Sequence, residues 1–248
     1  PLADYSLTPT IAIVDPALVM TVPDFVTADT GMDVLTHAIE AYTSTLANDY
    51  TDGLALQAIK LVFENLESSV KNADFVSREK MHNASTMAGM AFANAFLGMS
   101  HSMAHKVGGF FHTVHGRTNA ILLPYVIRYN GTRPAKTSTW PKYNYYRADE
   151  KYQDIARMLG LPSSTPEEAV DALAKAVYEL GEAVGIEMNF KAQGVNHKEW
   201  LATIHEIAML AYEDQCSPAN PRLPMVAHME EILADAYFGY KERPGRLK

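Results

Sequence analysis

The stretch GMDVLTHAIEAYTS, residues 31–44, combines a predicted helix with two side chains that can bind a metal ion. Asp29 or Thr30 can cap a helix that runs through this stretch to its end. Residues i and i+4 lie one above the other on a helix face, so Asp33 and His37 can bind one ion together. Further ligands must then come from elsewhere in the fold.

A second stretch, HSMAHKVGGFFHTVHG at residues 101–116, supplies those ligands. His101 and His105 share a helix face, and the two glycines after them can turn the chain so that His115 approaches His101. Spacing alone leaves the choice open among these three histidines and His112. One carboxylate with neutral imidazoles and no thiolate suits Fe(II) or Zn(II), and it indicates a catalytic rather than a structural site.

Glu40 lies on the same predicted helix face as Asp33 and His37. Its carboxylate can orient a ligand histidine through a hydrogen bond. It can also form an ion pair at the surface, and the surface ion pair is the interpretation that the sequence favours. Glu79 and His82 have the Glu-x-x-His spacing of di-iron bundles, but that chemistry needs a second copy, which this sequence lacks.

Most of the chain is predicted to be helical. The short apolar run at residues 11–14 ends in Asp15-Pro16, which is typical of one buried strand followed by a turn. Beyond residues 31–44, helices are expected at about 52–71, 76–97, 101–111, 119–129, 150–159, 166–184, 197–213 and 224–239. The pattern predicts one all-α domain.

Composition excludes some classes of partner. The formal charge of −8 without a Lys/Arg cluster argues against nucleic-acid binding, which depends on basic side chains. No apolar run is long enough to span a bilayer, so no membrane association is expected. A single cysteine, Cys216, and the lack of a charged-then-apolar leader favour a cytoplasmic setting. The first residue is Pro1, and we expect the chain to be a fragment whose preceding part is missing.

GMDVLTHAIEAYTS and the region AGMAFANAFLGMSHSMAHKVGGFFHTVHGRTNAILLPYVIRYN, residues 88–130, resemble the signature of the iron-containing (group III) alcohol dehydrogenases. PLADYSLTPTIAIVDPALVMTVP at residues 1–23 and EDQCSPANPRLP at residues 213–224 resemble one branch, the alcohol dehydrogenase half of the bifunctional aldehyde/alcohol dehydrogenases. The resemblance implies the helical C-terminal domain of a dehydroquinate-synthase-like fold, at residues 23–248. Residues 1–22 would be a strand and turn left from an upstream nucleotide-binding domain.

The resemblance also implies roles for individual residues. The metal ligands of the family fall on Asp33, His37, His101 and His115. His105 matches a histidine near the nicotinamide and the substrate, which orders the site or relays a proton. Phe92 and Cys216 match residues of the substrate pocket, and Leu18 lies on the segment that passes the cofactor cleft. No role follows for His112.

The function implied by the resemblance is interconversion of a short-chain primary alcohol and its aldehyde, ethanol and acetaldehyde first, with NAD(H). Fe(II), with Zn(II) as the alternative, acts as a Lewis acid on the substrate oxygen, and one carboxylate with three neutral imidazoles preserves that acidity. The expected partners are a nucleotide-binding domain and an aldehyde dehydrogenase domain of the same polypeptide, and further copies in a homo-oligomer or filament. The alternative is a non-catalytic fragment that binds metal or serves assembly.

Overall fold

The computed structural model describes residues 4–134 and 146–243, so parts of both predicted domains, at 1–3, 135–145 and 244–248, lie outside the described residues. Nine α-helices form the described part of the chain, and none of its residues is in a strand. They are α1 (Asp24–Thr43), α2 (Asp49–Lys71), α3 (Phe75–Ala95), α4 (Met99–Phe111), α5 (His115–Gly131), α6 (Ala148–Met158), α7 (Pro166–Ala183), α8 (His197–Tyr212) and α9 (Val226–Phe238). The prediction of an all-α fold is confirmed.

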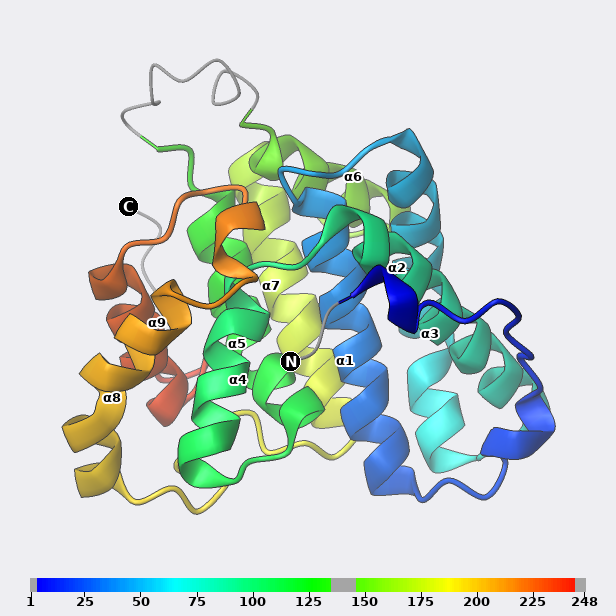
Figure 1. Ribbon diagram of the computed structural model, residues 1–248, viewed down its shortest axis with the longest axis horizontal. Coiled ribbons are helices and arrows are strands. Elements are labelled where there is room, and N and C mark those ends of the chain that lie inside the picture. Colours follow the sequence, from blue (N-terminus) through cyan, green and yellow to red (C-terminus); the bar gives the residue numbers. More distant parts are fainter. Residues whose placement is uncertain (1–3, 135–145, 244–248) are drawn as a thin grey trace.

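Helix α1 lies at the centre of the arrangement. It packs against α2 and α3 on one side and against α5 on the other, and α4 joins α5 to the outer pair α8 and α9 (Figure 1). Its inward face carries Met32, Leu35 and Ile39, none of which is exposed to solvent. Within the described ranges, no helix has the length and apolar character needed to cross a membrane. The central position of α1 brings its polar residues close to α3, α4 and α5.

The strand predicted at residues 11–14 is not formed. These residues belong to no regular element, and Ile11 and Ile13 are 79% and 84% exposed. A strand exists only where its backbone pairs with a neighbouring strand, and the described residues offer no such neighbour. The segment leads instead into a short 3₁₀ helix, η2 (Pro16–Val19), which Asp15 caps by accepting a hydrogen bond from the Ala17 N–H.

The predicted start of α1 is also wrong. The helix begins at Asp24, after Pro23, and Asp29 lies inside it rather than at its cap. The Asp29 carboxylate accepts two hydrogen bonds from Arg117 of α5, at 2.9 and 3.0 Å. A buried carboxylate paired with a guanidinium needs no capping role to be stable in a helix. This pair ties the first turns of α1 to α5.

The approach of α1 and α5 is close at Gly116. A β-carbon at this position would lie 2.1 Å from the backbone oxygen of Asp29 and 3.1 Å from the β-carbon of Asp33. Backbone atoms cannot move aside as the end of a flexible side chain can. Glycine at residue 116 therefore sets the spacing of two helices that carry site residues.

We expect Gly116→Ala to lower the free energy of unfolding by about 1–3 kcal/mol, the usual effect of overpacking. Gly53→Ala is the matched control, because Gly53 of α2 has nothing within 4 Å of an added β-carbon. That control should raise the stability by up to about 1 kcal/mol, since alanine is the better helix former. Denaturant titration of both variants measures the difference, and equal effects would contradict the close approach.

Candidate metal centre

The four side chains predicted as ligands are neighbours on three helices; the ligand atoms of Asp33, His101 and His115 form one close group, and His37 lies beside it. Asp33 and His37 project from the middle of α1, His101 from the first turn of α4, and His115 is the first residue of α5. The Asp33 Oδ1 atom lies 3.7 Å from His101 Nε2 and 3.6 Å from His115 Nε2. The ring of His37 lies beside that of His101, with centroids 4.3 Å apart.

These distances fit a single bound ion. Two ligand atoms that are each about 2.1 Å from one tetrahedral ion lie roughly 3.4 Å apart. One atom from each of Asp33, His101 and His115 can be chosen so that all three lie within 4.8 Å of one another. A carboxylate oxygen and imidazole nitrogens form a donor set suited to Fe(II) or Zn(II).

Hydrogen bonds orient two of the imidazoles. His37 Nδ1 lies 2.8 Å from the Asp33 backbone oxygen, and His101 Nδ1 lies 2.7 Å from Glu40 Oε2. Each Nδ1–H donates to its oxygen, which leaves Nε2 of the same ring as the atom available to a metal. The Nε2 of His101 is buried and has no hydrogen-bond partner. Such an unpaired buried polar atom is costly, and a cation bound at this point would pair it.

The charges around the site favour a cation there. Burial lowers the pKa of His37 to about 4, so this imidazole is neutral at pH 7, as a ligand must be. Burial also acts to lower the pKa of His101, but the carboxylates of Asp33 and Glu40 outweigh it and raise this pKa to about 9. Burial alone would raise the pKa of Asp33, yet the imidazoles of His101, His37 and His115 hold it well below its usual range.

Glu40 is a buried residue of the site, so the favoured interpretation of a surface ion pair is wrong. Its side chain is 3% exposed. Besides the hydrogen bond from His101, it accepts one from the Gly98 N–H at 2.9 Å and one from the Ser100 N–H at 2.7 Å. These N–H groups lie at the start of α4, where the helix leaves its own donors unpaired. The three donors come from another helix, which the sequence around Glu40 cannot reveal.

Asn119 is a further site residue that the sequence did not indicate. It lies one turn after His115 on α5 and is fully buried. Its Nδ2 donates to Asp33 Oδ1 at 2.8 Å and lies 3.2 Å from His115 Nε2. The amide therefore holds two of the predicted ligands together. The i+4 spacing from His115 was the only signal that could have identified it.

His105 lies next to the four residues and is held by its own partner. Its Nδ1 lies 3.1 Å from Asp214 Oδ2, and its ring stacks on that of His115 with centroids 5.4 Å apart. Lys106 Nζ lies 2.8 Å from the same Asp214 oxygen. Asp214 was not identified from the sequence, because it lies more than a hundred residues after His105. Lys106 was not identified because its role depends on its contact with Asp214.

Cys216 lies beside this pair, and its thiol can approach His105 and Asp214. The ammonium group of Lys106 already neutralises Asp214, which argues against a second metal site here. Burial, followed by the charges of Glu40 and Asp214, raises the pKa of the Cys216 thiol. The residue is 3% exposed, so its thiol is buried and unreactive.

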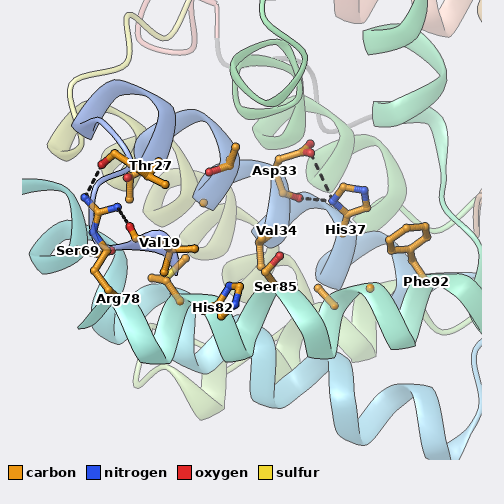
Figure 2. Close-up of a pocket in the computed structure, with 16 residues that line it drawn as sticks. Val19, Thr27, Asp33, Val34, His37, Ser69, Arg78, His82, Ser85 and Phe92 are labelled. Atoms are coloured by element: carbon orange, nitrogen blue, oxygen red, sulfur yellow. Dashed lines mark hydrogen bonds and ion pairs between the residues drawn. The ribbon is translucent and has the colours of Figure 1, made fainter. Parts of the chain in front are cut away.

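A pocket of about 440 Å³ opens from the site between α1 and α3 (Figure 2). Asp33 and His37 line it, and Phe92 of α3 lies against His37 with ring centroids 4.6 Å apart. Cys216 lies outside this lining, on the side of the site that carries His105. Of the residues predicted to contact substrate, the structure places Phe92 in the pocket.

Two other residues lie away from the pocket. Leu18 is in η2 and is 73% exposed, and it does not line the pocket. His112 is exposed and ends α4 in a left-handed conformation with φ of 54°. This position at the helix end explains why His112 does not join the other histidines.

Comparison with known proteins shows which family this chain resembles. The model of the "Fe-containing alcohol dehydrogenase family, C-terminal" matches residues 27–237. An aldehyde-alcohol dehydrogenase of Streptococcus pneumoniae serotype 2 is 82% identical over the whole chain, which spans 28% of that relative. The crystal structure of an iron-containing alcohol dehydrogenase from Thermococcus thioreducens has a TM-score of 0.83 at 34% identity, over 96% of this chain and 57% of that one.

A third similar protein has been solved with a cofactor. The sulfoacetaldehyde reductase from Bifidobacterium kashiwanohense in complex with NAD⁺ has a TM-score of 0.77 at 27% identity, over 96% of this chain and 57% of that one. The chain thus spans a little over a half of these solved chains and less than a third of the streptococcal relative.

We expect Glu40→Gln to lower the free energy of unfolding by about 1–3 kcal/mol, because the new NH₂ group would face N–H donors and leave at least one of them unpaired. Glu64→Gln is the control. Glu64 lies on the exposed side of α2, 3.9 Å from Lys60, and its loss should change stability by less than about 0.5 kcal/mol. Denaturant titration tests this prediction. Equal unfolding midpoints for Glu40→Gln and the parent would show that the hydrogen bonds to Glu40 do not stabilise the fold.

Proposed function

This chain belongs to the Fe-containing alcohol dehydrogenase family, and from that premise we propose that it interconverts a short-chain primary alcohol and its aldehyde, with ethanol and acetaldehyde as the first pair to test. The observation that carries the proposal is the convergence of Asp33, His101 and His115 around the unpaired, buried Nε2 of His101. His37 completes the donor set from the same helix as Asp33.

We propose that Asp33, His37, His101 and His115 hold Fe(II), with Zn(II) as the alternative. When bound, the divalent ion would supply Lewis acidity toward the oxygen of the alcohol or carbonyl. Glu40 and Asn119 would keep the ligand atoms in place, since each hydrogen bonds to a ligand and is almost fully buried. Loss of a residue that orients a ligand in this way typically lowers metal affinity or activity by about 10–100-fold.

The remaining residues would act on the substrate. Phe92, packed on His37, would cover the reacting carbon and exclude water. Asp214 fixes the tautomer of His105 through Nδ1, which leaves Nε2 to exchange a proton with the substrate oxygen or a water. Cys216 would border the substrate on the His105 side. Hydride would pass between the alcohol carbon and the nicotinamide of NAD(H).

The cofactor and the partners belong to the proposal as well. The complex of sulfoacetaldehyde reductase with NAD⁺ supports NAD(H) as the cofactor. Because the chain spans 28% of its streptococcal relative, we expect a nucleotide-binding domain and an aldehyde dehydrogenase domain on the same polypeptide. Leu18, with its exposed apolar side chain, would lie along the cofactor cleft. The division at residues 22 and 23, a cytoplasmic setting and self-association through further copies remain predictions.

Metal content tests the proposed site. We expect about one Fe or Zn per chain in protein purified anaerobically, and a loss of most of that metal in Asp33→Asn, which removes the charge and keeps the shape. Asp24→Asn changes an exposed carboxylate on the same helix and should leave the metal content unchanged. Elemental analysis measures all three proteins. Absence of metal from the parent, or full retention in Asp33→Asn, would contradict the assignment.

A second prediction separates the histidines that would bind the metal from the histidine that would exchange a proton. His101→Ala and His115→Ala should lose the metal, whereas His105→Ala should keep it and lower kcat by at least about 100-fold, the lower range for loss of an acid–base group. Metal analysis together with steady-state kinetics separates the two classes. Equal metal loss in all three variants would show that the ligand assignment is wrong.

A further inference from the structure

The pocket extends well beyond the predicted metal ligands. Its lining residues on α3 run from Phe92 at one end to Arg78 at the other (Figure 2). At 1.5 Å per residue, this stripe is about 21 Å long. Ethanol would occupy only the end beside His37 and Phe92. The rest of the pocket has no assigned use in the proposed reaction.

Arg78 bounds one end of the pocket, and much of the lining is apolar. Arg78 donates hydrogen bonds to the backbone oxygens of Val19 and Val22, which fixes the η2 segment across that end. Apolar side chains of the lining include those of Val34, Met81, Ala88 and Phe92. Polar side chains are interspersed with them, and Ser85 lies beside Val34 (Figure 2). The pocket is therefore elongated, and its apolar walls can contact a carbon chain along its length.

Gly89 keeps this pocket open. It lies inside α3, where glycine is the less favourable residue, yet its φ is not positive, so the backbone does not require glycine. No neighbouring atom requires it either, because an added β-carbon would have nothing within 4 Å. The residue lines the pocket. A side chain at position 89 would therefore enter space that is otherwise available to a ligand.

We propose that the pocket between α1 and α3 receives the carbon chain of primary alcohols and aldehydes longer than two carbons, and that Gly89 sets the length that is accepted. The inference rests on the proposed function, because it places the reacting carbon beside His37 and Phe92, whose rings contact each other. The alkyl chain then runs past Ala88 and Gly89 along α3. Apolar contact with these walls favours a longer chain over ethanol.

Substitution at Gly89 tests the inference in the full polypeptide, which supplies the nucleotide-binding domain that hydride transfer to NAD⁺ requires. We would measure kcat/KM for ethanol, 1-butanol and 1-hexanol in the parent and in Gly89→Ala, Gly89→Val and Gly89→Leu. The ratio of 1-hexanol to ethanol should fall stepwise with side-chain size, by at least about tenfold in Gly89→Leu, as is usual when a pocket loses room for one or more methylenes. Gly53→Leu is the matched control, an exposed helix glycine with nothing within 4 Å, and it should leave the ratio unchanged.

A binding measurement provides a readout independent of turnover. Without NAD⁺, 1-hexanol should raise the Tm of the parent and of Gly53→Leu, but not that of Gly89→Leu. An unchanged ratio of kcat/KM values across the Gly89 series, or an equal Tm rise in Gly89→Leu, overturns the inference while the proposed function stands. If the parent oxidises none of the alcohols, the proposed function fails, and the Tm measurement alone decides whether the pocket binds the longer chain.

Discussion

The buried carboxylate of Glu40 is the constraint on which the rest of the site depends. It accepts the first free N–H groups of α4 and the Nδ1–H of His101, so one side chain of α1 fixes where α4 begins and how its histidine is turned. Gly98 fits closely beside it, because a β-carbon there would lie 2.7 Å from Asn220 Oδ1 and 2.9 Å from Glu40 Oε1. A negative charge can stay buried because three donors surround it and the N-terminus of α4 faces it.

Much of the fold was predictable because helices are specified locally. The apolar spacing and the caps in the sequence place most helix ends within a few residues, as at α2, whose N-cap Asn48 accepts hydrogen bonds from the Tyr50 and Thr51 N–H groups. The strand at residues 11–14 failed for the opposite reason. An apolar run has strand propensity, but a strand depends on a partner backbone that the run itself cannot specify.

The residues of the site also fall into those that the sequence indicates and those that only the packing of the helices reveals. Asp33 and His37 could be paired from i+4 spacing, and the resemblance to the family extended the set to His101 and His115. Glu40, Asn119 and Asp214 could not be assigned in advance, because each acts through a hydrogen bond to a residue on another helix. Their side chains are ordinary ones for a helix or a loop, and only the packing of α1, α4 and α5 gives them a role.

The amide of Asn119 has a consequence for the speed with which the site fills and empties. Its Nδ2 lies between Asp33 Oδ1 and His115 Nε2, where it keeps two electron-rich atoms at close range without a metal. In the proposed metal site, an arriving ion would meet atoms that are already assembled, but the amide would first have to release His115 Nε2. Asn119 would then occupy the ion's place in its absence, and the lifetime of a bound ion would depend on how readily this one amide turns back.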